Sequence, residues 1–230
     1  MTRRLCVIPA RGGSKRLPRK NAAEFLGRPI IAYTVDAALR ADRFARVVVS
    51  TDDGEIAAAA GAAGAEVDPR PAHLAGDDAG IADVCLELLD REEAAGRTYD
   101  VLAILLATAA LRTAADVRAT VDLVGPGGVE FAMAVTTFGF PPHQALRDDG
   151  AGGLRALWPD LINARSSEFG QVCVDNGSTY AAAVPAYRAR RGDLYAPGLR
   201  GHVMPRARSV DIDYAEDLDF ARLLAQAAAP

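Results

Sequence analysis

Apolar runs of strand length alternate with helix-like segments over the first two thirds of the chain. The runs LCVIPA (5–10), RVVVS (46–50) and DVLAILLAT (100–108) have the composition of strands buried on both faces. Amphipathic helix patterns separate them, as in PIIAYTVDAALRA (29–41). This alternation predicts an α/β fold with a mostly parallel sheet and helices on both faces. Ligands bind beyond the carboxyl ends of such strands, so the loop after residue 10 lies at a candidate binding edge.

The regular alternation stops between residues 138 and 175. This stretch is rich in Pro and Gly, and its RDDGAGG segment has the composition of a hairpin turn. We therefore predict a single domain over residues 1–230 with an inserted β-rich arm at about 138–175. Large side chains such as Phe138 and Phe140 would be unfavourable if exposed in a monomer. We expect the arm to pack on a second copy, in a homodimer.

The composition argues against several classes of protein. The net charge of −4 is unsuited to general nucleic-acid binding, which needs a basic face. Three widely spaced cysteines form no CxxC pair, which argues against a metal–thiolate site and a disulfide framework. No apolar run approaches the roughly 18 residues of a membrane span, and the N-terminus lacks a signal-peptide pattern. We expect a cytoplasmic protein without a nucleic-acid or membrane partner.

The loop IPARGGSKRLPRKN (8–21) gathers five cations around a glycine pair. It holds Lys15 and Lys20, the only lysines of the chain. Glycines after a strand allow backbone N–H groups to converge on an anion, and cations add charge-assisted bonds to phosphate oxygens. The spacing is neither that of a P-loop nor GxGxxG, and the alternative is a solvated basic turn. The strand-end position and the flanking prolines favour polyphosphate binding.

Two aspartates stand two positions apart in RSVDIDY. If this stretch is extended, Asp211 and Asp213 point to one side of the backbone, where they suit Mg²⁺. The alternative is that Asp213 caps a helix starting at Tyr214, which leaves Asp211 for the metal. Two other motifs are weaker. STDD (50–53) favours a helix cap, and Arg70 either reaches a base or phosphate or is a surface arginine.

These motifs together resemble the acylneuraminate cytidylyltransferases, the synthetases of CMP-activated sugar acids. IPARGGSKRLPRKN, VVVSTDD, RPAHL, FPPHQAL, NARS and RSVDIDYAEDLDFA are similar to family motifs, in order, over nearly the whole chain. FPPHQAL, NARS and the closing DID are most similar to the pseudaminic acid branch. The resemblance implies a Rossmann-like fold, Mg²⁺ as cofactor, and a homodimer whose arm helps to build the neighbour's site. It also implies transfer of CMP from CTP to an acidic acceptor with release of pyrophosphate.

The loop composition and the resemblance together give a set of candidate site residues. The expected catalytic residues are Arg11, Lys20 and Asp211, and the expected metal ligands are Asp211 and Asp213. The expected nucleotide-binding residues are Ala10, Arg11, Gly12, Gly13, Ser14, Lys15, Lys20, Asn21 and Arg70. The expected acceptor-binding residues are Gln144, Arg165 and Asn176, with Arg165 acting across the dimer.

Several positions depart from the family pattern on the acceptor side. Ala107 and Ala110 replace both prolines of a PTAP or PTSP turn, and Leu106 stands where many members have Gln. Ala79 and Ile81 replace hydroxyl residues. A buried polyhydroxylated sugar needs hydrogen-bonding partners, so these losses bear on the acceptor.

Three hypotheses for function follow from this pattern. The leading acceptor is a nonulosonic acid of the pseudaminic or sialic type, favoured by FPPHQAL and NARS. The first alternative is a small phosphonate such as phosphonoformate, activated in natural-product biosynthesis. The second alternative is an inactive nucleotide-binding paralogue, suggested by the lost prolines.

Overall fold

The computed structural model describes residues 2–76 and 78–228, and its centre is a seven-stranded sheet. The strand order is β11-β7-β10-β6-β1-β4-β5. The strands of this sheet are β1 (Arg4–Pro9), β4 (Arg46–Thr51), β5 (Glu66–Pro69), β6 (Val101–Leu105), β7 (Phe131–Thr137), β10 (Cys173–Ala183) and β11 (Arg200–Val203). Two small hairpins are formed by β2 (Glu24–Phe25) with β3 (Arg28–Pro29) and by β8 (Leu146–Asp148) with β9 (Leu154–Ala156).

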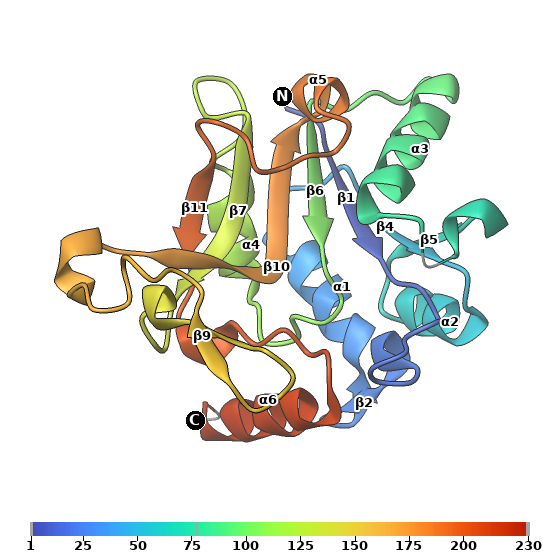
Figure 1. Cartoon of the computed structure of the whole chain (residues 1–230). Coiled ribbons are helices and arrows are strands. Elements are labelled where there is room, and N and C mark those ends of the chain that lie inside the picture. Colours follow the sequence, from blue (N-terminus) through green and yellow to red (C-terminus); the bar gives the residue numbers. More distant parts are fainter. Residues whose placement is uncertain (1, 77, 229–230) are drawn as a thin grey trace.

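The sheet is parallel except for one strand. β1 pairs in parallel with β4 and β6, β4 with β5, and β7 with β11. β10 is antiparallel to both of its neighbours, β6 and β7. Figure 1 shows this directly, since the arrows of β1 and β6 point down while that of β10 points up. The predicted mostly parallel α/β sheet is therefore confirmed.

Helices cover both faces of the sheet. Successive side chains of a strand point to opposite faces, and here the apolar side chains on both faces are buried against helices. The helices are α1 (Ile30–Ala41), α2 (Gly54–Ala62), α3 (Ile81–Ala94), α4 (Ala114–Val121), α5 (Val184–Ala189) and α6 (Ala215–Ala227). Along β1, Cys6 and Ile8 pack with α1, α2 and α4. Leu5 and Val7 face the other way and pack with α3 and α5. The core consequently has two layers, one on each face.

A third apolar cluster attaches α6 beyond the carboxyl ends of the strands. It packs Leu218 and Ala221 of α6 against Phe25 of β2 and the fully buried Ile212. Because Ile212 is anchored in this cluster, its two neighbours Asp211 and Asp213 are held at a fixed place beside the strand ends. The position of the two carboxylates thus depends on an apolar contact.

The arm leaves the sheet after β7 and returns at the start of β10. It contains the β8–β9 hairpin and the 3₁₀ turn η4 (Ser166–Phe169). Figure 1 shows it on the left, on the side of the sheet away from α2 and β5. Its apolar side chains are poorly covered: Phe140 is 86% exposed and Leu154 65%. Within the described part of the chain no helix is long and apolar enough to cross a membrane.

Candidate active site

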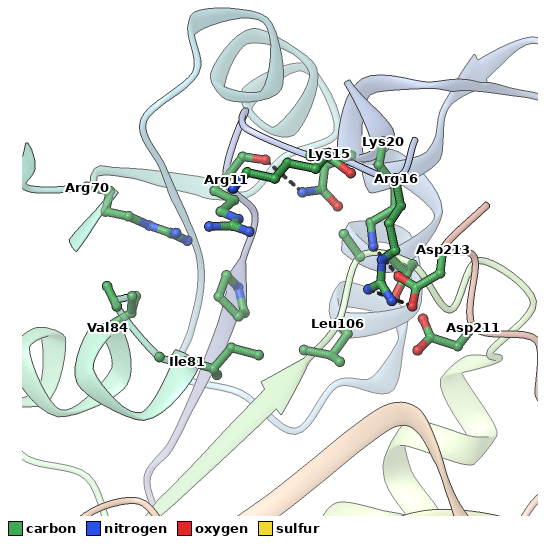
Figure 2. Close-up of a pocket in the computed structure, with 17 residues that line it drawn as sticks. Arg11, Lys15, Arg16, Lys20, Arg70, Ile81, Val84, Leu106, Asp211 and Asp213 are labelled. Carbon is green, nitrogen blue, oxygen red and sulfur yellow. Dashed lines mark hydrogen bonds and ion pairs between the residues drawn. The ribbon is translucent and has the colours of Figure 1, made fainter. Parts of the chain in front are cut away.

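A cavity of about 630 Å³ opens beyond the carboxyl ends of β1 and β6. Three segments form its walls: the basic loop after β1, the first turn of α3, and residues 211–213 before α6. Figure 2 shows these walls around one space. Of the predicted residues, Arg11, Ser14, Lys15, Lys20, Asn21, Arg70, Asp211 and Asp213 line the cavity. Arg70 and residues 106–108 complete the lining, so five separate parts of the sequence are brought together at the edge where a ligand is expected.

Asn21 fixes the backbone of the basic loop. Its side chain is almost buried, and its amide donates to the carbonyl oxygen of Arg11 over 2.9 Å. Arg11 in turn contacts the carbonyl oxygen of Gly76 at 3.4 Å. Asn21 thus holds the loop in place as well as lining the cavity.

The glycine pair is arranged differently from the sequence expectation. The amide of Gly12 donates to the Asp52 carboxylate at 3.0 Å, and the amide of Ser14 donates to the Gly12 carbonyl at 3.1 Å. A side chain at position 12 would lie 2.7 Å from Asp53, which caps α2 by accepting from the amides of Glu55 and Ile56. The cap predicted for STDD is thereby confirmed. Two of the loop amides expected to face an anion are engaged within the protein, and Gly12 is needed for close packing.

The opposite wall carries the two aspartates. Asp213 accepts from Lys20 Nζ at 2.6 Å and pairs with a guanidinium nitrogen of Arg16 at 2.7 Å (Figure 2). The alternative cap at Asp213 is wrong, because α6 begins at Ala215 after the N-cap residue Tyr214. The carboxylate of Asp217 accepts the amides of Asp213 and Tyr214 instead. The side chain of Asp213 is thus directed to the cavity and its cations.

Asp211 is held differently from Asp213. Desolvation by the surrounding wall raises the pKa of Asp211, and the charge of Asp213 adds to that effect. A hydrogen bond with Thr108 and the charges of Lys20 and Arg16 act in the opposite direction. A side chain at Gly177 would come within 2.7 Å of its carboxylate, so β10 approaches Asp211 closely here.

These two carboxylates fit a hard divalent cation. Across residues 2–76 and 78–228, no three His, Cys, Asp or Glu side chains gather into a metal-binding group. An ion at Asp211 and Asp213 would therefore take its other ligands from water and from a phosphate-bearing substrate, as Mg²⁺ commonly does. The neighbouring cations, which suit phosphate oxygens, agree with that donor set.

The remaining wall combines one arginine with apolar side chains. Arg70 is partly buried and donates to the Ser50 carbonyl at 2.8 Å. Burial lowers its pKa, while the charge of Asp52 opposes that shift. Ala79, Ile81 and Val84 from the start of α3 lie beside it. This wall offers an apolar surface and a single cation, which differs from the polar side at Lys20 and Asp213.

The three expected acceptor residues lie outside this cavity. Gln144 and Arg165 are exposed on the arm. Asn176 is buried in β10, where its amide donates to Ser209 Oγ at 3.0 Å and to Met204 Sδ at 3.3 Å. The position of Asn176 therefore gives it a structural role in this chain.

One buried arginine that sequence reasoning did not single out supports the cavity floor. Arg112 is 4% exposed and donates to Thr34 Oγ1 at 2.7 Å, to the Leu106 carbonyl at 3.1 Å and to the Ser178 carbonyl. Burial lowers its pKa to about 10. It thus ties together α1, β10 and the end of β6, where Leu106 lines the cavity. Its place at the end of ALLATAALR, after a buried strand, is the only sequence signal.

Comparison with known proteins supports the resemblance to cytidylyltransferases that the sequence motifs indicated. A family model described as cytidylyltransferase matches residues 5–117. The pseudaminic acid cytidylyltransferase of Campylobacter jejuni is 32% identical over 221 residues, which cover 96% of this chain and 95% of that protein. The CMP-N,N'-diacetyllegionaminic acid synthase of Legionella pneumophila is 34% identical over 213 residues, covering 91% and 90%.

A solved structure agrees on the fold. The CMP:2-keto-3-deoxy-manno-octonic acid synthetase complexed with CTP superposes with a TM-score of 0.72, at 18% identity, over 99% of this chain and 100% of that one. The chain is thus a nucleotidyltransferase with a Rossmann-like fold. It belongs to the cytidylyltransferase family, with the acylneuraminate cytidylyltransferases among its relatives, as its motifs predicted.

Proposed function

We propose that this protein transfers CMP from CTP to a nonulosonic acid and releases pyrophosphate. The observation that carries the proposal is the cavity at the strand ends, with loop cations at its top and two aspartates on one side. A triphosphate and an acidic acceptor need this combination, because both bring negative charge to the same place. The apolar wall next to Arg70 suits the base and ribose, which carry no charge.

In the proposed reaction, a hydroxyl oxygen of the acceptor attacks the α-phosphorus of CTP. The new P–O bond forms as the bond from the α-phosphorus to the bridging oxygen breaks, and pyrophosphate leaves with that oxygen. The hydroxyl proton passes to solvent. Arg11 and Lys20 line the cavity, and in this reaction they would stabilise the charge that builds up on the leaving group. Because a lysine is a compact charge on a flexible stem, Lys20 is suited to follow the pyrophosphate.

Asp211 and Asp213 are the proposed ligands of Mg²⁺. When bound, this ion would neutralise phosphate charge and hold the α-phosphate towards the acceptor. Two other side chains hold Asp211 and Asp213 in position. Ile212 anchors the segment in the α6 cluster, and Asp217 accepts a hydrogen bond from the backbone amide of Asp213. The backbone of this segment is therefore held by contacts within the protein.

The proposed acceptor follows from the named relatives, which act on pseudaminic and legionaminic acids, and these names do not favour a phosphonate. Gln144 and Arg165 lie on the exposed arm. We propose that in a homodimer they complete the acceptor side of the neighbouring cavity. A partner would also cover the apolar side chains of the arm, such as Phe140 and Leu154.

The test is to incubate the purified protein with CTP, Mg²⁺ and separate acceptors: pseudaminic, legionaminic and sialic acids, and phosphonoformate. Pyrophosphate release and the mass of the CMP product are measured. We expect release with at least one sugar acid and none with phosphonoformate. CTP binding without turnover of any acceptor would contradict the proposal and indicate an inactive paralogue.

Two variants link the activity to the site. Asp211→Asn should lose about a hundredfold or more in kcat, while CTP binding measured without a divalent cation changes little, as expected for a residue acting mainly in the transition state. Asp219→Asn is the matched control, since Asp219 pairs with Arg222 on the exposed side of α6. Wild-type kcat in Asp211→Asn would remove Asp211 from the metal site.

A further inference from the structure

Two cations of the loop contact the same carboxylate. Asp213 is within 2.6 Å of Lys20 Nζ and within 2.7 Å of Arg16. Both contacts are visible in Figure 2 on one side of the cavity. Lys20 is only 15% exposed and Asp213 25%, so the pair is partly shielded from water, whereas Arg16 is 54% exposed. The side chain assigned to the metal is thus already neutralised by the protein.

This arrangement conflicts with metal binding before the nucleotide arrives. A divalent cation on Asp213 would stand next to two positive charges, and like charges a few ångströms apart repel strongly where water is partly excluded. The conflict disappears once a triphosphate is present. Its oxygens are alternative partners for Lys20 and Arg16, and charge-assisted bonds to phosphate are strong.

We propose, on the basis of the function proposed above, that Lys20 and Arg16 form a cation-occupied state of the metal site that the nucleotide opens. When the triphosphate binds, the two cations exchange Asp213 for phosphate oxygens, and Asp213 becomes available to the metal together with Asp211. Metal binding is therefore coupled to nucleotide binding. Arg16 is a positioning residue in this scheme: it acts on the metal through Asp213, and its planar fork and stacking on Tyr214 at 5.5 Å keep it at that carboxylate.

The coupling is reciprocal. If the nucleotide strengthens metal binding by some factor, the metal strengthens nucleotide binding by the same factor. The scheme also gives a use to the loop's flexible cations before catalysis. Before the nucleotide binds, they offset the repulsion between the neighbouring carboxylates of Asp213 and Asp211.

The test measures binding of Mn²⁺, as a paramagnetic stand-in for Mg²⁺, by electron paramagnetic resonance of the purified protein without acceptor. Without nucleotide, wild type should bind Mn²⁺ weakly. Arg16→Met, which keeps the apolar stem and removes the charge, should bind it about three- to fivefold more tightly, the scale expected for a partly exposed pair. With saturating CTP this advantage should vanish. Lys20→Met should change binding in the same direction.

Arg19→Met is the control, because it removes the same charge from the same loop but from a residue that pairs with Glu55. Equal Mn²⁺ affinity of Arg16→Met and Arg19→Met without nucleotide would overturn the proposed coupling. Asp213→Asn distinguishes this failure from failure of the proposed function. If that variant bound Mn²⁺ as well as wild type in the presence of CTP, the metal site itself would be wrong, and the coupling with it.

Discussion

The carboxylate of Asp52 accepts a hydrogen bond from the amide of Gly12 at 3.0 Å and so joins the end of β4 to the loop after β1. The next residue, Asp53, caps α2 and leaves no room for a side chain at position 12. The conformation of the loop after β1 is consequently set from the segment that follows the neighbouring strand β4. Two acidic residues from a distant part of the sequence therefore hold this loop.

This contact predicts different outcomes for the two glycines. Gly12→Ala places a methyl group 2.7 Å from Asp53 and must displace either the loop or the cap. We expect a loss of about 1 kcal/mol in the free energy of unfolding, comparable to loss of a helix cap, and weaker CTP binding. Gly13→Ala is the control, since no heavy atom lies within 4 Å of the added carbon. Urea unfolding and CTP titration compare them, and equal losses in both variants would contradict the explanation.

Substitution of Arg112 tests what supports the cavity floor. Arg112→Met removes bonds to Thr34, Leu106 and Ser178 but also removes a buried charge, so we expect about 2 kcal/mol of destabilisation. Arg112→Lys keeps the charge but loses the planar guanidinium group that makes these bonds. It should be the less stable variant, because an incompletely paired buried charge costs more than an apolar replacement.

Unfolding in urea shows which of the two variants, Arg112→Met or Arg112→Lys, has the lower free energy of unfolding. Arg118→Met in α4 is the control, since Arg118 makes one bond to the carbonyl of Arg40. A lysine variant more stable than the methionine variant would show that the charge, rather than the geometry of the fork, matters at position 112.

Asp116 predicts a dependence of stability on pH. It is 3% exposed; burial alone would raise its pKa, but bonds from Arg208, Thr113 and His202 outweigh burial and lower the pKa to about 2. The folded-state pKa is below the ordinary value of 3.8, so the ionised form stabilises the fold. This contribution, about 2 kcal/mol, is complete above pH ~5 and is lost as pH falls towards 2.

Asp116→Asn should therefore be less stable than wild type at pH 7, with the difference shrinking in acid. Unfolding in urea at several pH values measures it. Asp219→Asn, at an exposed ion pair, should change stability by less than about 0.5 kcal/mol. A constant difference between Asp116→Asn and wild type from pH 7 to pH 3 would be inconsistent with this origin.

The arm predicts association of two chains. Phe140 is 86% exposed, so Phe140→Ser should leave the fold of one chain unchanged. If a partner buries this ring, each substituted copy removes about 2 kcal/mol, so the dimer loses about 4 kcal/mol and its dissociation constant rises about a thousandfold. Sedimentation over a range of concentrations gives that constant. Val67→Ser, on β5 at the far edge of the sheet, should leave it unchanged, and a monomeric wild type at micromolar concentration would exclude the dimer.

Local patterns in the sequence predicted the strands and the location of the cavity well. A buried strand followed by glycines and cations indicates its own place in an α/β sheet, and β1 with its loop agrees with that expectation. Asp211 and Asp213 were also recognisable, because residues two positions apart point to one side of an extended backbone. Both signals are short-range.

The remaining features depend on contacts between distant parts of the chain. Nothing near Gly12 indicates that Asp52 takes its amide, and nothing near Asp213 shows that Arg16 and Lys20 reach it. Asn176 has a polar side chain that suits ligand binding, yet in β10 its side-chain amide donates to Ser209. Such partners are far away in the sequence, so motif position alone does not indicate them.

The antiparallel strand β10 has a consequence for how the chain is made. β6 lies between β1 and β10, and β10 follows the whole arm in the sequence. During synthesis the edge of β6 that pairs with β10 therefore has no partner strand until the arm and residues 173–183 have been made. An open edge of this kind invites pairing with other chains. Correct assembly of the sheet thus depends on timing, because α4, β7 and the arm are all synthesised between these two paired strands.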